Sequence, residues 1–88
     1  MEVLVGKVKH YYSKISVAVV ELEENLKIGD EIIVRKKNGE EKFRQKVESM
    51  EIEGKKIESA GGGSEIALKV ANKVKEGDLI YKEIETFI

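Results

Sequence analysis

The sequence predicts an all-β fold, a small six- to seven-stranded antiparallel β-barrel. Apolar and polar residues alternate with a period of two, and turn signals recur about every 8–12 residues. Residues 27–30 recur in outline as residues 75–78, and each copy places Lys-x-Gly-Asp directly before an apolar strand. The chain contains no proline, which would blunt an edge strand, so closure of the sheet is favoured.

The first half of the chain is expected to form three strands. Residues 3–12 begin the sheet, with Val8 on the face opposite to its two lysine neighbours. Residues 14–22 form the second strand, and residues 30–37 follow the first Lys-x-Gly-Asp turn as the third. In each such turn the glycine tolerates a positive φ, and the aspartate accepts hydrogen bonds from nearby backbone N–H groups.

The second half supplies the remaining strands. Asn38-Gly39 predicts a two-residue type I′ turn, because both residues accept a positive φ. Residues 41–53 return as a long fourth strand, in which a bulge near residues 48–49 brings Met50 into phase with Phe43. Gly54 and the Gly61-Gly62-Gly63 stretch are predicted turns. The last strands are expected at residues 55–59, 65–70 and 78–84.

Composition narrows the class of protein. The 88 residues are expected to form one domain, residues 1–88, and 41% hydrophobic residues exclude intrinsic disorder. The absence of cysteine excludes disulfides, thiolate zinc sites and thiol nucleophiles. We expect a cytoplasmic monomer that binds no membrane, nucleotide, metal or other cofactor. The excess of Glu and Lys is typical of hyperthermophile proteins and also of mesophiles with lysine-rich proteomes.

Several short motifs fall in the order seen in the second domain of elongation factor Tu, which the chain resembles. More closely, the chain is similar to short prokaryotic proteins called translation elongation factor-like; a related barrel ends the collagenase-like peptidase family. The resemblance implies a free-standing translation-factor β-barrel. The chain holds no phosphate-binding Gly-x-x-x-x-Gly-Lys-Ser/Thr loop, so no GTPase domain is expected. The motifs are Val5-Gly6-Lys7-Val8, His10-Tyr11-Tyr12, Lys14-Ile15, Val17-Ala18-Val19, Leu26-Lys27-Ile28-Gly29-Asp30, Gln45-Lys46-Val47-Glu48-Ser49-Met50, Ala60-Gly61-Gly62-Gly63 and Glu76-Gly77-Asp78.

Charge is distributed unevenly along the chain. Residues 21–31 carry five acids and one base, whereas residues 35–46 carry six bases and two acids. A two-residue loop at Asn38-Gly39 would place Arg35 opposite Lys42 and give up part of the roughly 0.2–1 kcal/mol of a good cross-strand pair. An anionic partner would explain this choice, and RNA phosphate is one. The basic residues predicted to share one face of this hairpin are Arg35, Lys37, Lys42, Arg44 and Lys46.

Aromatic residues lie beside further bases in the first strand. Tyr11 and Tyr12 can stack unpaired bases, although alternation sends them to opposite faces. Either tyrosine can instead plug an end of the barrel with its hydroxyl exposed. His10 is the single histidine, and no acid cluster at ligand spacing accompanies it.

Three functions are consistent with these patterns. The first is non-catalytic binding of RNA or a ribonucleoprotein, such as tRNA or the ribosome, through the basic hairpin; the hairpin could equally be a solvated face. The second is a protein-interaction module that docks on a partner protein without nucleic acid. The third is self-association through the out-of-phase residues Val20, Leu22 and Ile33. No nucleophile–base arrangement is evident, so we expect a protein that is not an enzyme.

Overall fold

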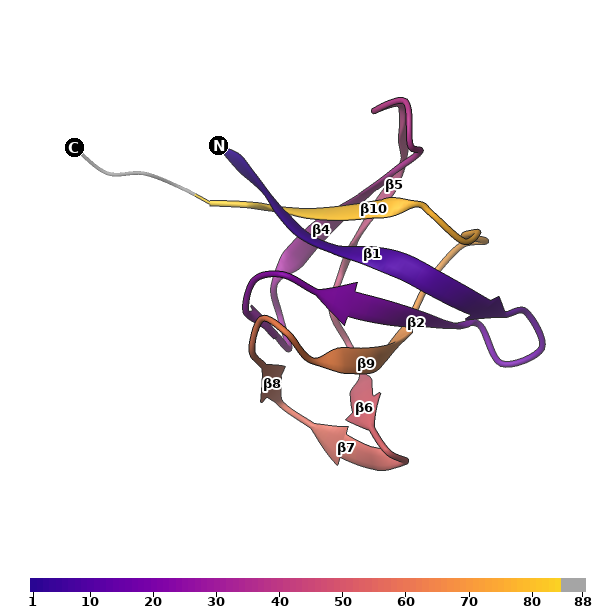
Figure 1. The fold of residues 1–88 in the computed structure, drawn as a ribbon, viewed down its shortest axis with the longest axis vertical. Helices are drawn as coiled ribbons and strands as arrows, with labels where there is room; N and C mark the ends of the chain where they lie inside the picture. The colour runs from indigo at the N-terminus through magenta and orange to yellow at the C-terminus, as the bar shows by residue number, and fades with distance from the viewer. Residues whose placement is uncertain (85–88) are drawn as a thin grey trace.

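A computed structural model describes residues 1–84 and shows an all-β fold built of antiparallel strands, with no helix in that part of the chain (Figure 1). It therefore contains no helix able to span a membrane. The prediction of an all-β fold with antiparallel strands is confirmed. The strands are β1 (Glu2–Tyr12), β2 (Val17–Leu22), β3 (Leu26–Lys27), β4 (Glu31–Arg35), β5 (Glu41–Lys46), β6 (Met50–Ile52), β7 (Lys55–Ile57), β8 (Ser59–Ala60), β9 (Glu65–Lys69) and β10 (Leu79–Glu83).

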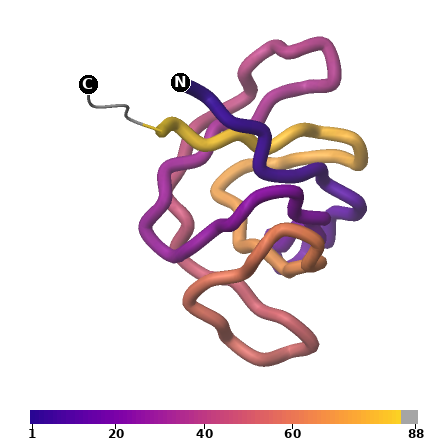
Figure 2. Tube along the Cα trace, turned by 60° about the vertical axis from the view of Figure 1, so that its left-hand side comes forward, coloured from indigo at the N-terminus to yellow at the C-terminus, as the bar shows by residue number. Residues whose placement is uncertain are grey.

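Eight strands form one sheet and two form a small ribbon. The order in the large sheet is β5-β4-β10-β1-β2-β9-β6-β7, and β3 pairs with β8 in the ribbon. Strand β1 lies in the middle, between β2 and β10, and shifts register at Gly6 and again near Val8. Figure 2 shows the chain start beside the end of β10, where the Met1 ammonium lies 3.1 Å from Glu83 Oε1.

Alternation of side chains along the strands builds a single apolar core. In β2, Ala18, Val20 and Leu22 point inward and are at most 1% exposed. Ile33 is 2% exposed. Because Val20, Leu22 and Ile33 are all buried, the predicted self-association surface is wrong.

The prediction of a closed barrel is also wrong. Strands β5 and β7 are the two end strands of the large sheet, and no ladder between described residues joins them. The single long strand expected at residues 41–53 is divided into β5 and β6, because residues 47–49 belong to no strand. Val47 and Met50 nevertheless both enter the core, as the predicted change of phase near residues 48–49 requires.

A glutamine side chain bridges the place where the ladder is interrupted. The Gln45 amide nitrogen donates to the carbonyl oxygen of Lys69 at 3.0 Å. Its amide oxygen accepts from the backbone N–H of Ala71 at 2.7 Å. These bonds tie the end of β5 to the segment that follows β9, in place of strand pairing.

The hairpin between β4 and β5 has a three-residue loop, so the predicted two-residue type I′ turn is wrong. Gly39 has a φ of 93°, whereas Asn38 is not in the positive-φ region. The Lys36 N–H donates to the Glu40 carbonyl at 2.8 Å, which leaves residues 37–39 as the loop. The extra residue shifts the register and pairs Arg35 with Glu41.

The predicted like-charge pair between Arg35 and Lys42 is therefore absent. Farther along the same ladder, Ile33 lies opposite Arg44. The repulsion that favoured an anionic partner does not exist in the folded hairpin.

Candidate functional site

The bases of the β4–β5 hairpin are largely paired with acids of the same chain. Arg35 makes a bidentate pair with Glu2, with Nε–Oε1 and Nη2–Oε2 distances of 3.0 and 2.9 Å. This hydrogen bonding lowers the pKa of the Glu2 carboxyl and raises the pKa of the Arg35 guanidinium. Arg44 pairs with Glu41 at 3.0 Å. This hydrogen bonding lowers the pKa of the Glu41 carboxyl and raises the pKa of the Arg44 guanidinium.

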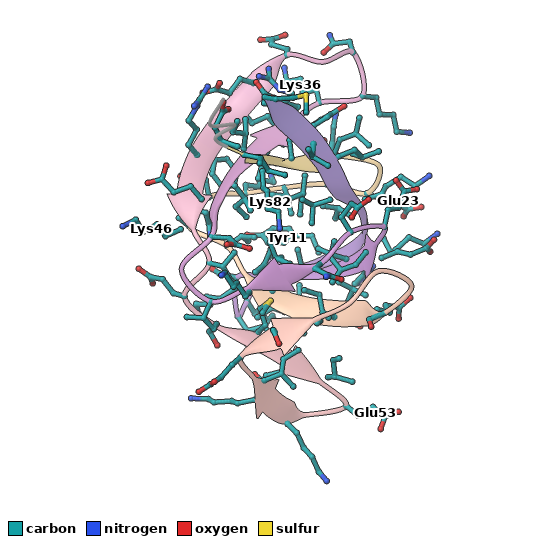
Figure 3. The ribbon with its side chains drawn as sticks, turned by 90° about the vertical axis from the view of Figure 1, so that its left-hand side faces the viewer. Tyr11, Glu23, Lys36, Lys46, Glu53 and Lys82 are labelled. Atoms are coloured by element: carbon teal, nitrogen blue, oxygen red, sulfur yellow. The ribbon has the colours of Figure 1, made fainter. Side chains whose placement is uncertain are left out.

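The other predicted hairpin residues lie in different surroundings. Lys42 reaches out of the hairpin to Asp78, with Nζ 2.8 Å from Oδ2. The Lys37 side chain lies across Gly77, at the place where a Cβ would be. Lys46 forms no ion pair with any of residues 1–84, and Figure 3 shows it away from Lys36, the base at the far end of the hairpin. The hairpin is therefore no continuous row of unpaired bases, and contacts of these residues with nucleic acid stay a prediction.

Tyr11 and Tyr12 point to opposite sides of β1, as their alternation predicts. Tyr11 is half-buried and packs against the core. Tyr12 is 51% exposed, and the His10 ring packs edge-on against it with ring centroids 4.4 Å apart. No group of three His, Cys, Asp or Glu side chains suited to a metal ion occurs in the described part of the chain.

The two Lys-x-Gly-Asp turns have the same backbone geometry. In the first, Lys27 N–H donates to Asp30 Oδ2 at 3.0 Å, and Asp30 N–H donates to the Lys27 carbonyl at 3.1 Å. In the second, Lys75 and Asp78 make the same two bonds at the same two distances. The central glycine of each has a φ of 94°. The sequence repeat is therefore a structural repeat.

Each aspartate also receives a lysine from a distant strand, and here the two turns differ. Lys42 holds Asp78 at 2.8 Å, and the Asp78 side chain is 0% exposed. Lys82 from β10 lies 3.6 Å from Asp30 Oδ2, beyond ordinary hydrogen-bond distance, and their side chains are 21% and 15% exposed. The second turn is a tight clasp, whereas the first is open.

The open turn lines a pocket of about 450 Å³, which lies within the range of about 300–1,000 Å³ typical of ligand pockets. The Lys82 ammonium is in its lining and donates to the Asn25 carbonyl at 2.7 Å. Figure 3 shows Lys82 in the middle of the face viewed, between Lys36 at one end and Glu53 at the other. The residues that line the pocket are Asn25, Leu26, Lys27, Asp30, Ser59, Ala60, Gly61 and Lys82.

Sequence reasoning did not find this pocket. The repeated turn predicts a structural role for Asp30 and gives no indication of a pocket. Lys82 carries no local signal, because it lies 57 positions from Asn25, the residue to which it donates. Only the folded arrangement of β3, β8 and β10 brings these polar groups together.

Comparison with protein families gives one match across most of the chain. Residues 2–80 match the C-terminal domain of peptidase family U32. An uncharacterized protease of Methanocaldococcus jannaschii is 41% identical over 83 residues, which are 93% of this chain. A collagenase of Porphyromonas gingivalis is 35% identical over 82 residues, which are 92% of this chain. The chain spans about one-fifth of the length of these two relatives.

Solved structures show the same fold. The C-terminal domain of a Geobacillus thermoleovorans protein assigned to the U32 peptidases superposes with a TM-score of 0.82. The match has 23% identity and covers 91% of each chain. The selenomethionine form of that domain gives a TM-score of 0.80 with 21% identity, over 89% of this chain and 96% of that one.

These findings correct the functional predictions. The resemblance to translation elongation factor-like proteins is wrong as an assignment of family, since the matched family is one of peptidases. The prediction of a translation-factor-like, RNA-binding module falls with it, and the protein-interaction alternative gains no support. The expectation that the protein is not an enzyme is contradicted as well, because its relatives are named protease and collagenase. The chain belongs to the family of C-terminal domains of the U32 peptidases.

Proposed function

We propose that this chain takes part in polypeptide hydrolysis as the C-terminal domain of a U32-type peptidase, and that it holds the polypeptide substrate. The observation that carries the proposal is the family match over residues 2–80, which the relatives named protease and collagenase support. Both names imply a polypeptide as the substrate of those relatives.

A substrate-holding role agrees with the chemistry on the surface of the chain. Binding energy from parts of a substrate remote from the scissile bond can be used to position that bond for attack. The pocket beside the first Lys-x-Gly-Asp turn combines apolar surface from Leu26 and Ala60 with several polar and charged groups, so it can contact both the side chains and the main chain of a polypeptide. A long polypeptide would profit from such a contact, whereas a very short peptide cut elsewhere would not reach it.

Direct binding tests the proposal. Fluorescein-labelled gelatin is titrated with the purified chain and followed by fluorescence anisotropy, with labelled dextran of similar size as the control polymer. We expect saturable binding to gelatin and none to dextran. Equal behaviour of the two polymers would overturn the proposal.

The M. jannaschii relative allows a second test in an intact peptidase. Its hydrolysis of labelled gelatin and of a quenched fluorescent pentapeptide is compared with and without the segment matched by this chain. Removal is expected to raise the KM for gelatin about ten-fold or more and to leave kcat/KM for the pentapeptide within about two-fold. An equal effect on both substrates would contradict substrate holding.

A further inference from the structure

The geometry points to the Asp30–Lys82 pair as a clamp for the main chain of one extended residue of a polypeptide. This inference rests on the proposed function and assigns it to a position in the structure. The clamp is defined as the Lys82 ammonium and the Asp30 carboxylate, which face each other in the pocket with Nζ 3.6 Å from Oδ2.

Both groups have hydrogen-bonding capacity that the described residues do not use. An ammonium has three donors, and that of Lys82 makes a hydrogen bond to the Asn25 carbonyl, at 2.7 Å. Asp30 Oδ2 accepts from the Lys27 N–H at 3.0 Å, while no hydrogen bond within residues 1–84 reaches Asp30 Oδ1. The clamp therefore offers a donor and an acceptor side by side.

A residue in extended conformation presents the complementary pair. Its own N–H and C=O point to the same edge, which is how two residues of an antiparallel ladder exchange two hydrogen bonds. The C=O of such a residue would accept from Lys82, and its N–H would donate to Asp30. The positive charge of Lys82 and the negative charge of Asp30 cancel, and the peptide main chain is neutral, so binding leaves no buried charge without a partner.

Further polar groups continue along the pocket. Ser59 lies on β8 and Asn25 directly precedes β3, and both line the pocket on the side of the β3–β8 ribbon. The Asn25 side-chain oxygen accepts from the Gly62 N–H at 3.3 Å, which turns the amide along that wall. The hydroxyl of Ser59 and the amide nitrogen of Asn25 can serve the residues on either side of the clamped one.

The second turn is the internal comparison. Asp78 has the same backbone bonds as Asp30, but its lysine lies at 2.8 Å and its side chain is buried. The open spacing at Asp30 is therefore no requirement of the turn itself. It depends on Lys82, which β10 supplies from one side of the pocket.

An uncharged peptide probes the clamp. The probe is a fluorescein-labelled nonapeptide of alternating glycine and alanine with an amidated C-terminus. A second peptide of the same sequence carries N-methyl groups on alternate residues. N-methylation removes main-chain donors, and loss of one hydrogen bond to a charged group weakens binding about ten-fold or more. We expect the N-methylated peptide to bind at least that much more weakly. Equal affinity of the two peptides would overturn the clamp.

Variants locate the contact. Lys82→Met removes the donor, and Lys69→Met is its matched control, because the Lys69 ammonium also donates to a backbone carbonyl, that of Ile15 at 3.0 Å, outside the pocket. Ser59→Trp fills the pocket from an exposed position and keeps the clamp intact. Circular dichroism verifies the fold of each variant.

Lys82→Met and Ser59→Trp are expected to weaken binding of the unmodified peptide at least ten-fold, and Lys69→Met by less than two-fold. If Lys82→Met does not fold, the Ser59→Trp variant decides. If gelatin still binds, and neither Lys82→Met nor Ser59→Trp weakens binding of the unmodified peptide, the clamp is overturned and the proposed function still stands. Absence of binding to both gelatin and the peptide would overturn both.

Discussion

Gly62 follows the pocket residue Gly61, and one methyl group added there should force two backbone segments apart. A Cβ built on Gly62 would lie 2.6 Å from the carbonyl oxygen of Glu23. The closest ordinary C···O contacts are about 3.3–3.6 Å, so the two segments would have to separate by about 0.7 Å. Glu23 cannot move easily, because its N–H donates to the carbonyl of Val5 in the buried part of β1.

The expected cost of Gly62→Ala follows from this overlap. Forcing an extra carbon into a packed region costs about 1–3 kcal/mol, and the reduced freedom of the unfolded chain returns about 0.4–1 kcal/mol. We expect a net loss of about 1–2 kcal/mol in the free energy of unfolding. For a domain of this size the melting temperature should fall by roughly 5–15 °C.

Gly61→Ala is the matched control in the same stretch. A Cβ on Gly61 would meet only the side-chain oxygen of Asn25, at an acceptable 3.4 Å, and Gly61 has no positive φ. We expect this variant to match the parent or exceed it by up to about 1 kcal/mol. Urea unfolding followed by circular dichroism measures both variants. A midpoint for Gly62→Ala at or above that of Gly61→Ala would refute the reasoning.

Three further predictions concern polar contacts. Gln45→Leu removes the bridge between β5 and the segment after β9 and should lower the free energy of unfolding by about 1–2 kcal/mol in urea titrations; an unchanged midpoint would contradict it. Glu2→Gln should lower the melting temperature at pH 7 but not at low pH. Arg35 lowers the pKa of Glu2, so the stability that the pair contributes is present above the ordinary carboxyl pKa near 4.5 and is lost as the pH falls through the lowered value; melting curves from pH 2 to 7 test the sign. Asp78→Asn leaves a largely buried lysine without its carboxylate and should cost about 3–5 kcal/mol, whereas Asp30→Asn at the open turn should cost about 1 kcal/mol or less. Similar urea midpoints for these two variants would show that the turns are equally tight.

The sequence predicts local structure well where a short-range signal exists. The two Lys-x-Gly-Asp turns were evident from their repetition, and the structure places a turn with the same two backbone bonds at each. The inward face of β2 was not predicted in this way, because Val20 and Leu22 were expected at a self-association surface and both are buried. Strand positions follow from such patterns, because burial of one face selects the period of two.

Register and closure could not be predicted in the same way. Asn38-Gly39 is compatible with a two-residue and with a three-residue loop, and only the second pairs Arg35 with Glu41. Closure of the sheet depends on pairing between its end strands, β5 and β7, which local sequence does not record. A pattern of apolar residues records that a side chain is buried but not which strand lies beside it.

The same limit explains why the pocket could not be predicted from the sequence. It also matters for how a binding site can arise in this family. The two turns share their sequence pattern and their backbone bonds, so local sequence alone makes them equivalent. They differ in the strand that supplies the lysine: β5 brings Lys42 into contact with Asp78, and β10 leaves Lys82 at 3.6 Å from Asp30. A turn that is a closed clasp at one end of the sheet thus becomes an open donor–acceptor pair at the other, without any change in the turn. Binding capacity at Asp30 is therefore a property of tertiary spacing, and a change on β10 could remove it while the repeated motif stays intact.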